Sequence, residues 1–204
     1  MPDFSDEAVG EAKADLRATL LARRRSLSAP ARQAAAERIQ AELAALVRRL
    51  RPDLITGYVP VGTEPGGRDL PDVLGAAVGP TGRLLLPVLR PDLGLDWAPY
   101  LGPESLVAAG RGMREPAGGR LGPAAIGAAG LVVVPAVAVD LRGMRLGRGG
   151  GSYDRALARV GAGTLVVALL HDGELIDSVP TRDHDRPVHG AITPTGGLRV
   201  LAPG

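Results

Sequence analysis

A succession of short apolar runs, separated by helical patterns or by Gly and Pro, constrains the fold of this chain most strongly. The longer runs are residues 54–59, 83–89, 131–137 and 164–170. Continuous hydrophobicity over so few residues is typical of a strand that is buried on both faces of a parallel sheet. Weaker strand candidates are 96–100, 189–193 and 198–201. The core must come from Leu, Val, Ile and Ala, because aromatic residues make up only 2% of the chain.

Helical patterns precede and interleave these runs. Residues 6–27 form the first amphipathic stretch, and we expect its arginines at 23–25 in solvent, where the C-terminal end of the helix dipole favours cations. Pro30 suits the first turn of a second helix, which Arg51-Pro52 ends. Shorter helical patches are 69–78 and 153–160. Strands that alternate with helices predict an α/β fold, a three-layer sandwich with a mostly parallel central sheet and the N-terminal helices packed on it.

We expect residues 1–204 to form a single domain, because this length suffices for one substantial core and is short for two. The stretch 110–130, rich in Gly, Ala and Pro, is predicted to be a long loop inside that domain. The longest apolar run, 131–139, is too short to cross a bilayer, and the acidic N-terminus lacks the apolar core of a signal peptide. These features predict a cytoplasmic protein that does not associate with membranes.

The composition excludes several kinds of site. The chain has no cysteine, which excludes disulfides, thiol nucleophiles and cysteine-based zinc sites. Its histidines at positions 171, 184 and 189 lack the second ligand pair of a zinc motif, and we expect them at the surface or in loops. Nucleic-acid binding is not expected, because the net charge is only +2 and the arginines are not interleaved with aromatic residues.

The most informative segment is the glycine-rich stretch 145–155, RLGRGGGSYDR, expected between the strand 131–137 and the next helix. Backbone N–H groups of such a turn can approach an anion, and Arg145 and Arg148 add planar donors that match phosphate oxygens. The segment is neither a Walker loop nor a dinucleotide-binding GxGxxG in its usual place. Two interpretations remain from the residues alone: a phosphate cradle, or a tight turn in which Asp154 caps the next helix.

The sequence LGRGGGSYDRAL at 146–157 resembles the pattern L-G-[YRF]-G-x-G-Y-Y-D-R of the 5-formyltetrahydrofolate cyclo-ligase family. Further segments resemble other elements of that family, in the family's order, at 13–17, 58–64, 112–116, 133–140 and 180–193. The resemblance covers nearly the whole chain. It implies a sandwich of the cyclo-ligase type, which is similar to the NagB, RpiA and CoA-transferase folds.

The resemblance also implies an activity. Family members use ATP and Mg²⁺ to convert 5-formyltetrahydrofolate to 5,10-methenyltetrahydrofolate, with release of ADP and phosphate. Such a ligase would act on small molecules, a reduced formyl-folate and ATP, with Mg²⁺ as cofactor, and we expect a monomer or a weak homodimer. The alternatives are a non-catalytic relative that binds folate or nucleotide and, last, an RNA-binding protein.

Residue roles follow from the resemblance by position. The ATP-binding residues would be Lys13, Arg17, Arg145, Leu146, Gly147, Arg148, Gly149, Gly150, Gly151, Ser152 and Tyr153. The substrate-binding residues would be Val59, Glu64, Arg148, Gly150 and Ser152. Glu64 can accept adjacent N–H donors from the edge of a pterin. Arg148 and Tyr153 would be catalytic, and Asp154 and Asp185 would hold Mg²⁺, which prefers oxygen ligands.

Each assignment has an ordinary structural alternative. Lys13, the one lysine of the chain, lies four residues before Arg17 on the same face of the predicted helix, and that face also suits plain solvation. The alternatives for the others are a loop carboxylate for Glu64, a helix cap for Asp154, a charged turn for Asp185 and helix packing for Tyr153.

The chain departs from the family pattern mainly on the folate side. Ser152 stands where the family often has tyrosine, and His189 stands at a position where the family has aspartate. An aromatic-and-glutamine element is expected after Leu170, but the chain reads His171-Asp172-Gly173 there. The identity of the acyl-folate substrate is therefore the prediction that these departures affect most.

Overall fold

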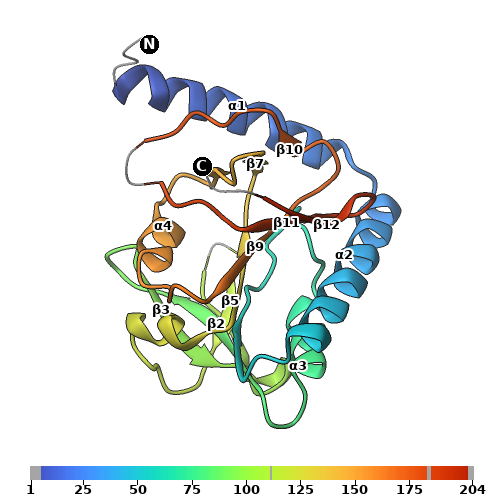
Figure 1. Ribbon diagram of the computed structural model, residues 1–204, viewed down its shortest axis with the longest axis vertical. Coiled ribbons are helices and arrows are strands. Elements are labelled where there is room, and N and C mark those ends of the chain that lie inside the picture. Colours follow the sequence, from blue (N-terminus) through green and yellow to red (C-terminus); the bar gives the residue numbers. More distant parts are fainter. Residues whose placement is uncertain (1–5, 111, 183–184, 202–204) are drawn as a thin grey trace.

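A seven-stranded sheet forms the centre of the molecule within residues 6–110, 112–182 and 185–201, the ranges that the computed structural model describes (Figure 1). Its strands are β1 (Leu54–Thr56), β2 (Arg83–Leu89), β3 (Leu95–Pro99), β6 (Leu131–Pro135), β9 (Leu165–Leu169), β11 (Gly190–Thr193) and β12 (Gly197–Val200). Their spatial order is β12-β11-β9-β6-β1-β2-β3. Neighbours from β11 to β2 are parallel, and the antiparallel strands β12 and β3 form the edges. The predicted α/β fold with a mostly parallel sheet is confirmed.

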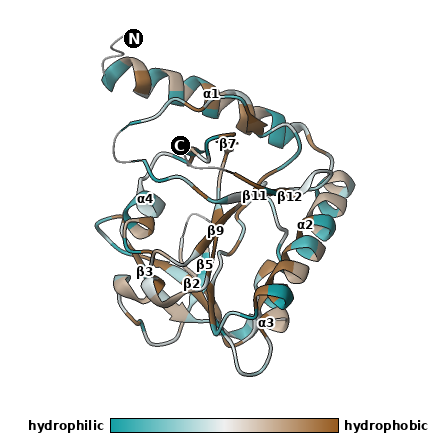
Figure 2. Cartoon of the chain, viewed as in Figure 1, coloured by the Kyte–Doolittle hydropathy of each residue, from teal (hydrophilic) through white to brown (hydrophobic). Residues whose placement is uncertain are grey.

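Most residues of the inner strands are hydrophobic (Figure 2) because both faces of the sheet are buried. In β6, Leu131 and Val133 join one core cluster, whereas Val132 and Val134 join the cluster on the opposite face. All four side chains are fully buried. Removal of apolar surface from water is the main favourable term in folding, so these strands contribute strongly to stability.

Helices cover both faces of this sheet. They are α1 (Asp6–Ser26), α2 (Ala29–Leu50), α3 (Leu70–Val78), η1 (Pro103–Ser105), η2 (Pro123–Ala128) and α4 (Ser152–Leu157). Leu43 of α2 and Leu74 of α3 pack on one face. Ile126 of η2 and Leu157 of α4 pack on the opposite face, which gives the predicted three layers. In the described part of the chain, no helix has the length and hydrophobicity needed to cross a membrane.

The boundaries of α2 follow from local sequence chemistry. The Ser28 side chain accepts a hydrogen bond from the backbone N–H of Ala31 at 3.3 Å and caps the helix, with Pro30 in the first turn. The helix ends at Arg51, which adopts φ 49° and donates its backbone N–H to the carbonyl oxygen of Val47. Both ends were predicted from the sequence.

A second sheet, three-stranded among the described residues, lies beside α1 (Figure 1) and carries the glycine-rich segment. Its strands are β7 (Ala138–Asp140), β8 (Arg145–Leu146) and β10 (Leu175–Ile176). Leu20 of α1 shares a core cluster with Ala138 and Leu146 of this sheet. As predicted, the glycine-rich segment 145–155 follows β6 and leads into the next helix, and its first two residues form β8, which pairs with β7.

Residues 110–130 are more regular than the predicted loop. β5 (Arg114–Pro116) pairs with β4 (Leu106–Ala108) in an antiparallel hairpin, and η2 follows it. The stretch therefore forms part of the wall beside β2, and Ile126 is buried in the core. These short elements were not predicted, because a high Gly and Pro content is typical of loops.

Arg24 contradicts the expected exposure of the arginines at 23–25. Its side chain is only 1% exposed, because it lies four residues after the buried Leu20 and shares that face of α1. Glu174 accepts hydrogen bonds from Arg24 Nε at 2.6 Å and from Arg24 Nη2 at 2.8 Å. A buried guanidinium is tolerated here because a buried carboxylate compensates its charge.

Candidate functional site

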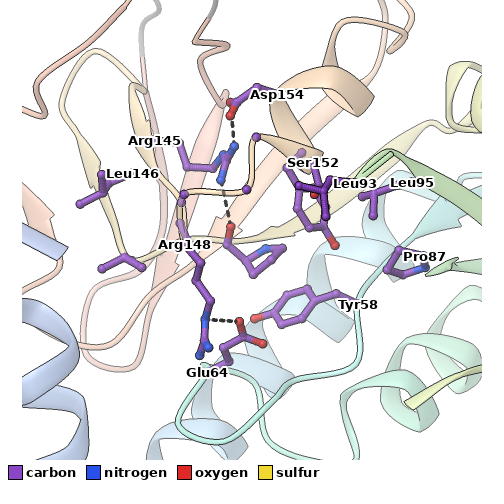
Figure 3. Close-up of a pocket in the computed structure, with 18 of the residues that line it drawn as sticks. Tyr58, Glu64, Pro87, Leu93, Leu95, Arg145, Leu146, Arg148, Ser152 and Asp154 are labelled. Carbon is purple, nitrogen blue, oxygen red and sulfur yellow. Dashed lines mark hydrogen bonds and ion pairs between the residues drawn. The ribbon is translucent and has the colours of Figure 1, made fainter. Parts of the chain in front are cut away.

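A cavity of about 620 Å³ lies where the carboxyl ends of the central parallel strands meet (Figure 3). Tyr58 and Val59 reach it after β1, Leu89 at the end of β2 and Pro135 at the end of β6. Open parallel α/β sheets bind their ligands at this edge. Residues of α1 and of the glycine-rich segment complete the walls.

Every site residue predicted from the sequence lines this cavity. These residues are Lys13, Arg17, Val59, Glu64, Arg145, Leu146, Gly147, Arg148, Gly149, Gly150, Gly151, Ser152, Tyr153, Asp154 and Asp185. Lys13 and Asp185 are 172 positions apart in the chain, so the fold and not the local sequence brings them together. The individual roles of these residues stay predictions.

The glycine-rich turn needs glycine at two positions where it bends. Gly149 has φ 104° and Gly151, which precedes α4, has φ 65°, both in the left-handed region that other residues disfavour. Arg17 Nε donates a hydrogen bond to the carbonyl oxygen of Gly147 at 2.8 Å. This bond ties the turn to α1, so the backbone of the turn is held against the cavity.

Asp140 holds the hairpin from which this turn departs. Its buried carboxylate accepts hydrogen bonds from the backbone N–H groups of Arg142, Met144 and Val179 and from the Arg142 guanidinium. Burial by itself raises the pKa of Asp140, but the hydrogen bonds outweigh burial and hold the pKa below its usual value of 3.8. Asp140 is therefore an ionised brace for the β7–β8 turn.

Inside the cavity, three basic side chains that were assigned to ATP form ion pairs with three carboxylates that were assigned to Mg²⁺ or to the substrate. The pairs are Lys13–Asp185 at 2.5 Å, Arg145–Asp154 at 2.8 Å and Arg148–Glu64 at 2.9 Å. The latter two are marked in Figure 3. Arg145 is almost fully buried, and its guanidinium carbon lies 5.9 Å from the centre of the Tyr153 ring. The Tyr153 ring and Asp154 together fix the position of this guanidinium group. Arg148 is half exposed and therefore more available to a bound anion.

Asp154 and Asp185 are the predicted Mg²⁺ ligands. Within the described ranges, no group of three or more His, Cys, Asp or Glu side chains could hold a metal ion. Mg²⁺ usually takes one or two carboxylates and completes its shell with phosphates and water, so two cavity carboxylates fit such an ion when a nucleotide is bound. Asp185 also accepts the backbone N–H of Arg182 at 2.7 Å, which fixes its position.

Two tyrosine hydroxyl groups face the same region. Burial, and next the nearby Glu64 carboxylate, raises the pKa of Tyr58 well above its ordinary value. Burial and Glu64 raise the pKa of Tyr153 as well, against the opposing effect of Arg145. Both hydroxyls therefore keep their protons at neutral pH and can donate hydrogen bonds. Tyr58 donates to the carbonyl oxygen of Pro65 at 2.6 Å.

Several wall residues were not predicted from the sequence. Arg182 lies against Gly10 of α1, where a Cβ would come within 2.9 Å of Arg182 Nη2. A glycine inside a helical pattern is the sequence signal that could have indicated this close approach. Glu115, in the segment 112–116, accepts a hydrogen bond from the backbone N–H of Leu89 at 2.9 Å and fixes the wall next to β2.

The histidines do not behave alike. His171 is buried, at 5% exposed, but it lies in the loop after β9, which agrees with the expectation of a surface or loop position. His189 is partly buried, and its Nδ1 accepts the backbone N–H of Val166 at 3.0 Å. His184 lies outside the described residues.

The fold and the cavity together are those of an α/β enzyme whose ligand site lies at the carboxyl edge of its sheet. Residues 9–194 match the model of the 5-formyltetrahydrofolate cyclo-ligase family. The chain belongs to this family, and it is a ligase.

Individual relatives agree with this membership. The 5-formyltetrahydrofolate cyclo-ligase of Mycolicibacterium smegmatis is 41% identical over 194 residues, which cover 93% of this chain and 97% of the relative. The NMR structure of Aquifex aeolicus 5,10-methenyltetrahydrofolate synthetase has a TM-score of 0.77 and 28% identity, with 94% of each chain covered. The 5,10-methenyltetrahydrofolate synthetase of Mycoplasma pneumoniae has a TM-score of 0.66 at 18% identity, covers 86% of this chain and 94% of its own, and shares the fold.

Proposed function

We propose that this chain converts 5-formyltetrahydrofolate to 5,10-methenyltetrahydrofolate in a reaction that consumes ATP, requires Mg²⁺ and releases ADP and phosphate. The observation that carries the proposal is that all residues assigned to the two substrates line one cavity of about 620 Å³. Cavities that bind small molecules commonly have volumes of roughly 300–1,000 Å³.

The phosphates of ATP would bind between α1 and the glycine-rich turn. Lys13 supplies a compact point charge, and Arg17 and Arg148 supply planar donors suited to phosphate oxygens. The backbone of Gly149 and Gly151 can approach an anion closely, because glycine carries no side chain of its own. These groups support nucleotide binding at this end of the cavity.

The reduced folate would bind at the end that carries Glu64. Its carboxylate can accept adjacent N–H donors of the pterin, and the apolar side chains of Pro87, Leu93 and Leu95 line the neighbouring wall (Figure 3). Tyr58 lies beside Glu64 in the same view. An apolar wall with one directed carboxylate is the pattern expected of a site for an aromatic, hydrogen-bonding ring.

The chemistry requires positioning and charge neutralisation more than covalent catalysis. The formyl oxygen attacks the γ-phosphorus of ATP, and ADP leaves. Nitrogen 10 of the folate then attacks the formyl carbon and loses its proton, the carbon–oxygen bond breaks, and phosphate departs as the ring closes. Arg148 would neutralise charge on the transferred phosphoryl group, and the protonated Tyr153 hydroxyl would donate a hydrogen bond beside it.

Asp154 and Asp185 would hold Mg²⁺ together with the phosphates of the nucleotide. The ion would supply charge neutralisation at the β- and γ-phosphates. Asp154 accepts a hydrogen bond from Arg145, and Asp185 accepts one from Lys13. These cations therefore keep both carboxylates oriented before the nucleotide arrives. A cytoplasmic location and a monomeric or weakly dimeric state stay predictions.

A turnover assay tests the proposal directly. Purified protein with 5-formyltetrahydrofolate, ATP and Mg²⁺ should generate the ultraviolet absorbance of the methenyl product, and Arg148→Ala should abolish most of it. Arg48→Ala, at an exposed position of α2, is the matched control and should leave the rate unchanged. Folded protein that binds ATP without forming product would refute the proposal. Stabilisation by both ligands without turnover would then favour a non-catalytic relative.

A further inference from the structure

The loop that carries Glu64 has no regular structure but is held at three of its carbonyl groups. Tyr58 Oη donates to the carbonyl oxygen of Pro65 at 2.6 Å, and Gln40 Nε2 donates to that of Gly66 at 2.7 Å. The third bond joins His171 Nε2 and the carbonyl oxygen of Thr63 at 3.0 Å. The donors come from three different parts of the chain, so the loop is fixed by its surroundings.

His171 binds the carbonyl group of the residue before Glu64, and Tyr58 binds that of the residue after it, so the two side chains hold Glu64 from both sides in the chain. A carbonyl oxygen only accepts hydrogen bonds, so Nε2 of His171 carries the proton. The other ring nitrogen, Nδ1, is buried and has no hydrogen-bond partner among the described residues. Among the described residues, the ring of His171 therefore makes one hydrogen bond, and its acceptor is in the loop that carries Glu64.

A buried network fixes His171 in turn. Glu174 Oε2 accepts the backbone N–H of His171 at 2.7 Å, and the backbone N–H of Glu174 donates to the carbonyl oxygen of His171. Both oxygens of Glu174 are engaged by Arg24, which also donates to the carbonyl oxygen of Ala136. Arg24 is itself a cavity residue. The buried Arg24–Glu174 pair, joined by two hydrogen bonds, therefore holds the backbone of His171 in place.

We infer that His171, held by Glu174 and Arg24, is a positioning residue for Glu64 and thus for recognition of the pterin edge. The inference rests on the proposed function. A carboxylate that accepts two adjacent N–H donors must be placed accurately, because a misplaced acceptor loses one of the two bonds. The segment after Leu170, where an aromatic-and-glutamine element was expected, therefore serves substrate recognition in this chain through His171 and Glu174.

Matched histidine variants test this role. His171→Leu removes the ring nitrogen but keeps an apolar side chain in the site, whereas His171→Gln keeps an N–H donor near the position of Nε2. The KM for 5-formyltetrahydrofolate should rise about tenfold in His171→Leu, the effect of one lost hydrogen bond of ordinary strength. The KM for ATP should stay within about twofold of wild type, and His171→Gln should restore most of the folate KM.

The control is His189→Leu, because His189 also makes a single hydrogen bond to backbone but does not line the cavity. It should change neither KM. Equal loss for folate and ATP, a failure of His171→Gln to restore the folate KM, or an unfolded His171→Leu protein would overturn the inference. Absence of turnover in wild type would refute the proposed function instead. Equilibrium titration with 5-formyltetrahydrofolate would then still distinguish His171→Leu from His171→Gln.

Discussion

Replacing Glu174 by glutamine should destabilise the fold by roughly 3–5 kcal/mol, because it leaves the Arg24 charge buried without compensation. The two side chains are 5% and 1% exposed, and two hydrogen bonds of 2.6 and 2.8 Å join them. Solvent cannot replace the lost carboxylate at this depth. For a chain of this size, such a loss lowers the Tm by roughly 6–20 °C.

A double-mutant cycle measures the interaction itself. Arg24→Met and Glu174→Leu should each be strongly destabilising. The double variant buries two apolar side chains, so its loss of unfolding free energy should be at least about 2 kcal/mol smaller than the sum of the two single losses. Urea denaturation with constant m-values gives the free energies of unfolding. The exposed pair Arg90–Asp92 is the matched control, and its removal should leave the free energy of unfolding nearly unchanged, because solvent screens the two charges. Additivity of the two buried variants within about 0.5 kcal/mol would refute the reasoning.

Further predictions concern the residues that bind each substrate and the stability of the fold in acid. Lys13→Ala should raise the KM for ATP about tenfold or more and leave the folate KM nearly unchanged, as measured by initial rates; equal changes would argue against a phosphate contact. Glu64→Gln should do the reverse and raise the folate KM by roughly 10–100-fold; unaltered folate binding would exclude the proposed pterin contact. Because the pKa of Asp140 is lowered in the folded state, its contribution to stability is present above pH 3.8 and is lost as the pH falls through the lower folded-state value. The free energy of unfolding of Asp140→Asn should therefore depend less on pH in this acid range than that of wild type, and parallel pH profiles would contradict the assignment.

The sequence predicted the central sheet because two-sided burial leaves continuous apolar runs, such as Leu131 to Val134 in β6. It predicted the glycine-rich turn because the positive φ angles at Gly149 and Gly151 demand glycine. It did not predict β8 or β10, since strands of two residues have no periodicity to detect.

Long-range electrostatic pairs could not be predicted from local patterns. Arg24 looks like an exposed helix arginine until the fold places Glu174 against it from 150 positions away. The same holds for His171, whose partner at Thr63 precedes it by 108 positions. Side chains of this kind are found only when topology, not composition, is known.

The cavity face of α1 would set the distance between the two proposed substrates. Gly10, Lys13, Arg17 and Arg24 recur at spacings of three, four and seven residues, so they lie along one stripe that is roughly 21 Å long at 1.5 Å per residue. As a single stiff helix, α1 would fix the separation between the triphosphate end of the cavity and the network that supports the pterin. An insertion of one residue between Arg17 and Arg24 would turn the following side chains by about 100° and put the two ends out of register. If the two substrates bind as proposed, the length of this helix segment matters for the reaction as much as the identity of the residues on it.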